Sequence, residues 1–189
     1  VFHVARGQHQ TAYRILVASA EGGLARDTGN LWDSGKVASD ETIQVPYRGQ
    51  TLQSSQQVFW KVRAWDKDGK EAAWSQPASW TMGLLSEPDW QARWVAAATE
   101  SETLLLRRAV TVKPGLKRAI AHFSGLGYYE LSVNGRKAGE DLLSPGWTKY
   151  DKACLYDTRD LTTLLREGPN VVGVLLGNGM YNVKGGRYT

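Results

Sequence analysis

The sequence predicts an all-β protein built from two small β-sandwich modules. Apolar residues alternate with period two in the most regular segment, residues 57–65, which places Val58 and Trp60 on one face of a strand. Similar strand-like segments recur along the chain at short spacing, separated by turn signals such as the Asn-Gly pair at 134–135. This combination of short strands and regular turns is typical of sandwiches.

The first module is assigned to residues 1–85. Strands are predicted at residues 12–18 and 57–65, and a turn follows at 66–69, where Asp and Gly suit a backbone with positive φ. A linker is assigned to residues 86–102, since Pro88 breaks regular structure there. Two linker aromatics, Trp90 and Trp94, are expected to pack this segment onto both modules.

The second module is assigned to residues 103–189. Its predicted strands are residues 104–112, 117–124, 128–133 and 170–176. The last of these is apolar on both faces and is expected to be a central strand. A single helical turn is expected at residues 160–168, with Asp160 as its N-cap and Gly168 as its stop.

Composition excludes several classes of protein. The chain has 189 residues, 42% of them hydrophobic, and a net charge of +4 that is spread along its length, so a packed core is expected and no nucleic-acid fingerprint accompanies the basic residues. No membrane span or signal peptide is evident, and the sequence does not indicate a cellular location. The single cysteine, Cys154, can form neither an intrachain disulfide nor a metal site, and we expect it to be a small buried hydrophobe.

The acidic residues do not form a recognisable catalytic pair. A glycosidase needs two carboxylates on either side of the scissile bond. The acidic residues considered for this role are Glu130, Glu140, Asp141, Asp151 and Asp157. Nothing in the sequence pairs them, and nucleophile and metalloprotease motifs are absent. The Gly-x-Gly pairs at 125–127 and 177–179 lack the following helix of a phosphate site, so we interpret them as tight turns, and no catalytic residue is assigned.

One aromatic loop has two interpretations. Trp147, Tyr150 and Asp151 follow Pro145 in a loop-like segment. Exposed aromatic rings on loops can stack on sugar rings while Asp or Asn binds the hydroxyl groups. Alternatively, Trp147 and Tyr150 plug one end of the sandwich, and this interpretation is favoured because tryptophan is mostly buried.

Ordered motifs over nearly the whole chain resemble a known family. In the second module these are GLGYYEL (125–131), VNG (133–135), SPGWTKYD (144–151), LYDT (155–158), DLT (160–162) and LGNGMY (176–181). They are similar to the N-terminal β-sandwich of bacterial α-L-rhamnosidases, glycoside hydrolase family 78. In the first module QTAYRILV (10–17), LWDSGKV (31–37) and WKVRAWD (60–66) resemble the module that precedes it. The resemblance implies a fibronectin-III-like module followed by a jelly-roll or galactose-binding-like module.

The family implies an activity that these residues do not themselves perform. Its members release terminal α-L-rhamnose with inversion, and their catalytic carboxylates lie in an (α/α)6 barrel that this segment does not contain. The downstream catalytic domain and a rhamnose-containing carbohydrate are therefore the implied partners, with no nucleic acid or membrane span.

The resemblance also suggests ligand residues. Some relatives bind rhamnose with calcium through Asp and Asn side chains, so calcium is the one cofactor left open, with Asn134, Asp141 and Asn178 as its candidates. The candidate sugar-binding residues are Trp147, Tyr150, Asp151 and Asn178. One departure from the family is Met180, where tryptophan is usual.

Two other functions and a prediction about the ends stay open. A pair of carbohydrate-binding modules and a structural or adhesive surface protein are the alternatives to the enzyme. Relative to the family, the first module is expected to lack its opening strand, since only Val1 to Val4 precede the first strand segment, and the second is expected to be truncated at its C-terminus. Incomplete sheets leave unpaired edges, so the isolated segment is expected to aggregate or to melt without cooperativity.

Overall fold

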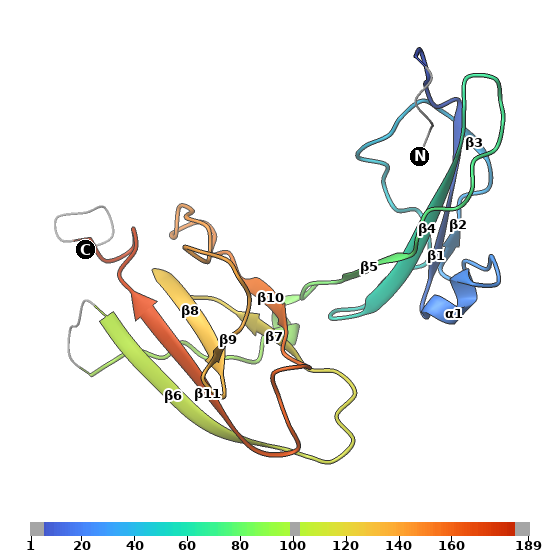
Figure 1. Cartoon of the computed structure of the whole chain (residues 1–189). Helices are drawn as coiled ribbons and strands as arrows, with labels where there is room; N and C mark the ends of the chain where they lie inside the picture. Colours follow the sequence, from blue (N-terminus) through green and yellow to red (C-terminus); the bar gives the residue numbers. More distant parts are fainter. Residues whose placement is uncertain (1–5, 99–102, 184–189) are drawn as a thin grey trace. The chain divides into compact units, whose positions relative to one another are not determined.

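The computed structural model describes residues 6–98 and 103–183, and confirms the all-β fold class (Figure 1). The chain divides into two compact units, residues 1–91 and 92–189, which are described separately. Val1 to Val4, and the predicted absence of an opening strand, lie outside the described residues. None of the helices in the described ranges is long and apolar enough to cross a bilayer.

The first unit is built on one antiparallel sheet of five strands. These are β1 (Ala12–Ala18), β2 (Trp32–Asp33), β3 (Val37–Ala38), β4 (Gln57–Trp65) and β5 (Ala78–Thr81). The order is β2-β1-β4-β5, with β3 also pairing with β1. The two long strands, β1 and β4, pair along the whole of β1, from Ala12 opposite Trp65 to Ala18 opposite Phe59. Their bounds are those that the period-two alternation predicts.

Both faces of this sheet are covered by other segments of the same unit. On one face, Val17 and Val58 pack with Leu52 and Tyr47 from the long connection between β3 and β4. On the opposite face, Leu16 and Ala18 pack with Leu24 of a short helix, α1 (Glu21–Leu24), and with Trp74. The sequence does not predict α1, which contains two glycines and has no side-chain N-cap.

The helix-covered face carries a buried lysine. Lys61 is only 6% exposed, and its Nζ donates to the backbone oxygen of Leu24 at 2.6 Å and forms an ion pair with Asp27. The same Nζ lies 4.6 Å from the centre of the Trp74 ring, and Arg63 lies 4.3 Å from it. These contacts compensate for the loss of water around the ammonium group.

The turn and linker predictions have different outcomes. In the predicted turn, Gly69 has φ of 73° and Asp66 Oδ1 accepts a hydrogen bond from the Lys70 amide at 2.8 Å. A short 3-10 helix, η1 (Glu87–Asp89), begins the linker. Trp90 is half-buried, whereas Trp94, which the sequence predicts as packed, is 62% exposed, because residues 91–98 all lie on the surface.

The second unit contains a four-stranded and a two-stranded antiparallel sheet. The described strands are β6 (Thr103–Val112), β7 (Ile120–Phe123), β8 (Tyr128–Val133), β9 (Arg136–Lys137), β10 (Asp157–Asp160) and β11 (Gly168–Gly177). The larger sheet has the order β6-β11-β8-β9, so β11 is the central strand that its two-sided apolar pattern predicts. The smaller sheet pairs β10 with β7.

The core of the second unit lies between these two sheets. Tyr129, Leu131 and Val133 of β8 point into it, as their alternation predicts, and Phe123 of β7 packs on Tyr129 with ring centres 4.5 Å apart. The hairpin between β8 and β9 has φ of 52° at Asn134 and 79° at Gly135, which confirms the predicted type of turn.

The predicted helical turn after β10 is only partly formed. Asp160 Oδ1 accepts a hydrogen bond from the Thr162 amide at 2.9 Å, and the Leu165 amide donates to Leu161 at 3.1 Å, as in one turn of helix. After this turn the chain leads into β11, which begins at Gly168. The predicted capping role of Asp160 is confirmed, and the turn is shorter than the predicted segment.

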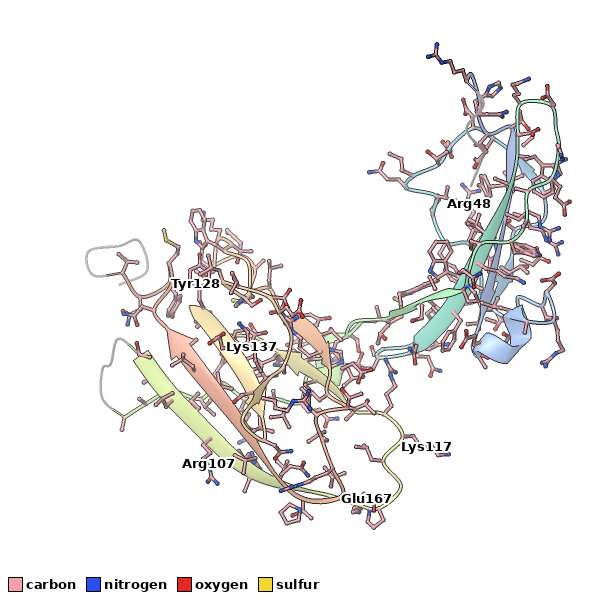
Figure 2. The ribbon with its side chains drawn as sticks, in the orientation of Figure 1. Arg48, Arg107, Lys117, Tyr128, Lys137 and Glu167 are labelled. Carbon is pink, nitrogen blue, oxygen red and sulfur yellow. The ribbon has the colours of Figure 1, made fainter. Side chains whose placement is uncertain are left out.

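The outer face of the four-stranded sheet is exposed. Leu105 of β6 is 83% exposed and Leu175, its partner on β11, is 40% exposed. Lys137 forms an ion pair with Glu130 on the same face, and Lys137 and Arg107 are labelled in Figure 2. Among the described residues, nothing apolar covers this face as α1 covers a face of the first unit.

Candidate functional site

Three of the acidic residues considered for catalysis are exposed on the surface. Glu130 on β8 pairs with Lys137, and a carboxylate oxygen of Asp151 lies 3.7 Å from Lys149 Nζ. Glu140 is exposed at the end of the segment after β9. Surface carboxylates of this kind lack the apolar surroundings of a catalytic general acid.

The other two acidic residues, Asp141 and Asp157, meet at Arg159 of β10. Arg159 forms an ion pair with Asp141, and its Nη2 lies 3.4 Å from Asp157 Oδ2 and 3.3 Å from Ser144 Oγ. The hydroxyl of Tyr129 donates to Asp157 Oδ2 at 2.5 Å. Burial, and then this hydrogen bond, raise the pKa of Tyr129 well above its usual value, so the phenol stays a donor.

This Arg159 cluster connects the two sheets of the second unit. Tyr129 belongs to the larger sheet, whereas Asp157 and Arg159 belong to the smaller one. One guanidinium therefore contacts both carboxylates. The cluster is a structural brace, and no catalytic pair is assigned among the described residues.

The residues proposed for sugar binding lie in two loops at one end of the second unit. Tyr150 is half-buried and packs edge-on against Tyr181 with ring centres 5.3 Å apart. Tyr181 comes three residues after Asn178, so the structure brings Tyr150, with its neighbour Asp151, toward the turn that Asn178 begins. Trp147 is 59% exposed, so its interpretation as a plug of the sandwich is wrong. A sugar-binding role for the four residues stays a prediction.

The three calcium candidates do not meet. Asn134 Nδ2 donates to the Leu164 backbone at 3.0 Å, and Asn134 therefore has the structural role that its turn position implies. Asn178 follows the end of β11 that pairs with Tyr128, at the opposite end of β8 from Asn134. Asp141 is bound to Arg159. In the described ranges, no three His, Cys, Asp or Glu side chains are arranged to hold a metal ion.

The two Gly-x-Gly segments are tight turns, as predicted, and the structure packs them on each other. A Cβ atom at Gly127 would lie 2.1 Å from the carbonyl oxygen of Gly177, and one at Gly179 would lie 3.0 Å from the Cα of Gly127. Glycine is required there because the two backbones touch. The prediction for Cys154 is wrong, since its thiol is exposed in a segment without strand pairing.

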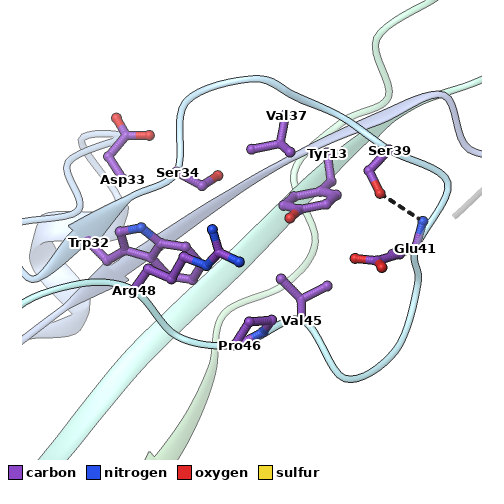
Figure 3. A pocket seen from close by; sticks show the side chains of 10 residues that line it. All are labelled: Tyr13, Trp32, Asp33, Ser34, Val37, Ser39, Glu41, Val45, Pro46 and Arg48. Atoms are coloured by element: carbon purple, nitrogen blue, oxygen red, sulfur yellow. Dashed lines mark hydrogen bonds between the residues drawn. The ribbon is translucent and has the colours of Figure 1, made fainter.

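A pocket in the first unit was not found by sequence reasoning (Figure 3). It has a volume of about 350 Å³ and lies between the sheet and the connection that follows β3. Tyr13 and Trp32 come from the sheet, whereas Glu41 and Arg48 come from the connection. Tyr13 lies on the same face of β1 as Ile15, and this alternation is a weak sequence signal for the pocket. The connection that covers this face has no periodicity, so its sequence does not place it over Tyr13.

Two family models match the chain in sequence order. The model for the Rha78A-like, N-terminal immunoglobulin domain matches residues 2–86, and the model for the alpha-L-rhamnosidase N-terminal domain matches residues 115–189. An alpha-L-rhamnosidase of Formosa agariphila is 34% identical over 200 residues, covering 93% of this chain. The chain belongs to the α-L-rhamnosidase family and matches the N-terminal region of its members.

Solved structures of α-L-rhamnosidases have the same fold in this region. The structure from Dictyoglumus thermophilum superposes with a TM-score of 0.85 at 33% identity, over 96% of this chain and 22% of that one. The structure from Aspergillus terreus has a TM-score of 0.73 at 28% identity, over 92% of this chain and 20% of that one. The chain spans about a fifth of the length of the curated rhamnosidases that it matches, 21% for the Formosa protein.

The family models also locate the features described above within rhamnosidases. The pocket beside Tyr13 lies in the part that matches the immunoglobulin domain, and the Arg159 cluster lies in the part that matches the rhamnosidase N-terminal domain. The first family model describes an immunoglobulin domain, whereas the sequence predicts a fibronectin-III-like module, and both types are β-sandwiches.

Proposed function

We propose that this chain is the non-catalytic N-terminal region of an α-L-rhamnosidase, a glycoside hydrolase that releases terminal α-L-rhamnose with inversion. The observation that carries the proposal is the ordered match of two rhamnosidase N-terminal domains to a chain that spans 21% of the Formosa agariphila rhamnosidase. The catalytic (α/α)6 barrel then lies outside this segment, in the same polypeptide.

The chemistry of the described residues supports a non-catalytic role. The acidic side chains of the second unit are exposed, paired with lysine, or joined to Arg159. In the first unit, the hydrogen bond from Arg14 lowers the pKa of Asp33, and the hydrogen bond from Lys61 lowers the pKa of Asp27. A general acid for glycoside cleavage needs a carboxyl group whose pKa is raised.

The proposed role of the two units is to support and position the catalytic domain. The exposed outer face of the four-stranded sheet, with Leu105 and Leu175, supplies apolar area of the kind that domain interfaces bury. The partner in this role is the catalytic domain of the same polypeptide, and rhamnose is the sugar that this domain releases.

The test uses the full-length protein and three exposed carboxylates. We expect it to hydrolyse an aryl α-L-rhamnoside and to produce the β-anomer first, as NMR of the fresh product would detect. Glu130→Gln, Glu140→Gln and Asp151→Asn should each leave kcat within about threefold, whereas loss of a general acid or base costs about 100-fold or more. A large loss in any of the three, or no action on rhamnosides, would contradict the proposal.

A second candidate function, carbohydrate binding by the second unit, is favoured by one observation. Trp147 is 59% exposed on a loop near Tyr150, as a sugar-stacking ring would be. Trp147→Ala should then abolish a fluorescence change on titration with L-rhamnose, with or without calcium. A flat signal up to about 100 mM, well above the millimolar dissociation constants of weak specific sites, would exclude this function.

A further inference from the structure

We propose that the pocket beside Tyr13 in the first unit binds a single neutral pyranose sugar. The pocket lies outside the second unit, where the sugar-binding candidates of the sequence are found, and its chemistry does not depend on the rhamnosidase activity. Its volume of about 350 Å³ is near the lower end of the range for ligand pockets, which suits one sugar ring rather than an oligosaccharide.

The hydroxyl of Tyr13 is the observation that points to a ligand. Tyr13 is only 9% exposed, yet its hydroxyl makes no hydrogen bond to any of the described residues. The hydroxyl oxygen itself is accessible from the pocket, and a tyrosine hydroxyl without a protein partner bonds to water or to a ligand. Figure 3 shows this hydroxyl facing the pocket, so the partner must come from what occupies the pocket.

The pocket exists because the sheet is not filled at this point. Tyr13 of β1 lies opposite Ala64 of β4, a small residue, whereas four pairs further along Val17 lies opposite Trp60. The large side chains around Val17 form a closed core with Leu52. At Tyr13, the covering connection leaves a space instead.

Two charged side chains complete the polar part of the pocket. Glu41 and Arg48 are both exposed residues of the covering connection, and neither has an ion-pair partner within residues 6–98. In Figure 3 the guanidinium of Arg48, the carboxylate of Glu41 and the hydroxyl of Tyr13 are turned toward the same space. A guanidinium only donates hydrogen bonds and a carboxylate only accepts them, so together they suit sugar hydroxyls, which do both.

The remaining lining residues are already engaged or apolar. Asp33 accepts two hydrogen bonds from Arg14, at 2.9 and 2.6 Å, and Ser34 Oγ accepts one from the Ile15 amide at 2.8 Å. These residues fix the shape of the wall. The apolar part of the wall consists of Trp32, Val37 and Val45. Apolar walls of this kind bind the C–H face of a pyranose.

The charges favour a neutral sugar over the alternatives. An anionic sugar would be repelled by Glu41, and a cationic one by Arg48. A purely apolar ligand would bury Tyr13 and Arg48 without hydrogen bonds, which is costly. A neutral pyranose is repelled by neither group, and its hydroxyls can hydrogen-bond to both.

The experiment is hydrogen–deuterium exchange by mass spectrometry on the full-length protein, since it reports on residues 11–18 and 36–50 whatever binds elsewhere. The probes are L-rhamnose, D-galactose and D-glucose as neutral sugars, D-glucuronate and D-glucosamine as charged ones, and glycerol as a cosolvent control, each up to about 100 mM. We expect at least one neutral sugar to protect both segments with a millimolar dissociation constant.

Matched variants separate a binding role from a structural one. Glu41→Gln and Arg48→Ala should each raise the dissociation constant of the sugar at least about tenfold, because a hydrogen bond to a charged group is lost. Glu21→Gln and Arg26→Ala change exposed residues outside the pocket and should leave the dissociation constant unchanged. Tyr13→Phe should also weaken binding but leave the melting temperature unchanged, because its hydroxyl has no partner among the described residues.

Three results would overturn the proposal. The first is that no neutral sugar protects the two segments at about 100 mM, in which case the pocket holds only water. The second is stronger protection by glucuronate or glucosamine than by every neutral sugar. The third is unchanged protection in both Tyr13→Phe and Arg48→Ala. None of these results bears on whether the full-length protein hydrolyses rhamnosides.

Discussion

The two units differ in whether the second face of their main sheet is covered or exposed. In the first unit, α1 and Trp74 cover the face opposite the long connection, so both faces of the sheet are buried. In the second unit, the smaller sheet covers one face, and the other leaves Leu105 83% exposed. Covering both faces forces the first unit to bury Lys61, whereas the second unit keeps its outer lysine, Lys137, near water.

The comparison teaches where polar interactions carry stability. A buried charged or polar group is costly when it loses its partner, whereas an exposed ion pair contributes little. Lys61 in the first unit, and Tyr129 and Asn170 in the second, are buried polar groups with hydrogen-bond partners. We therefore expect substitutions at these positions to change the free energy of unfolding far more than substitutions at exposed residues of the same type.

The largest effect is expected for Lys61→Ala. This substitution removes the bond to the Leu24 carbonyl and the contact with Trp74, and leaves a cavity, so the free energy of unfolding of the first unit should fall by about 2–4 kcal/mol. Lys137→Ala should change that of the second unit by less than about 0.5 kcal/mol. Native-state hydrogen exchange of β4 and β8 amides measures both. Equal effects would show that the two lysines are equivalent and that the comparison is wrong.

A smaller loss is expected for Tyr129→Phe. The substitution keeps the ring in the core but leaves Asp157 without its hydroxyl donor, so the second unit should lose about 1–2 kcal/mol. The control is Tyr128→Phe, one residue earlier on the outer face of β8, which should cost less than about 0.5 kcal/mol. Exchange rates of β8 and β10 amides distinguish them, and an equally mild Tyr129→Phe would mean that the Arg159 cluster is not a brace.

A pH dependence should distinguish the second unit from the first. Burial lowers the pKa of His122, on β7, below its usual 6.5, so the unfolded chain binds a proton there more readily than the folded one. The contribution of His122 is complete above pH 6.5 and is lost as the pH falls toward the lowered pKa of the folded state. The loss should stay below about 1 kcal/mol, because the imidazole is only partly buried.

This pH dependence is measured through the exchange of β7 and β10 amides between pH 7 and 5.5. His122→Gln should flatten the profile, whereas His9→Gln, at an exposed position of the first unit, should leave it as it is. A wild-type profile that is flat across this range would remove His122 from the comparison.

The smallest effect is expected for Leu105→Ser on the outer face. Within the second unit it should change the free energy of unfolding by less than about 0.5 kcal/mol, because the side chain is already 83% exposed. The adjacent Leu106→Ser, on the core side, should cost several times more. If Leu105→Ser were as costly in the full-length protein, another domain would be covering this face, as the proposed supporting role requires.

Strands with strict alternation could be predicted from the sequence almost to the residue. The strands at residues 12–18, 57–65 and 128–133 have their predicted bounds, because each is a run of strand-forming residues that ends at a turn signal. Several short elements have no prediction from the sequence, among them α1 and β10. The helix α1 carries two glycines and forms where Leu24 can pack under the sheet, and β10 is a polar strand, Asp157–Asp160, whose pairing with β7 leaves no apolar pattern.

For the candidate sites, too, local features could be predicted from the sequence and features that depend on packing could not. The absence of a paired carboxylate motif was evident from the sequence, and so was the turn role of the Gly-x-Gly segments. The exposure of Trp147 and Cys154 was not, because both lie in a loop where burial depends on what packs beside it. Similarly, nothing in the sequence indicated that Asp141 and Asp157 share one arginine.

By itself, the sequence determined the fold class, the main strands, the turn at 134–135 and, through its ordered motifs, the family. These properties depend on residues a few positions apart, whose alternation and turn chemistry act locally. Only the tertiary structure decided which polar groups meet. Tyr13 and Arg48 face one pocket, and Tyr129 and Asp157 form one hydrogen bond, from positions about thirty residues apart. Such contacts depend on how connections without periodicity cross a sheet, which local patterns do not specify.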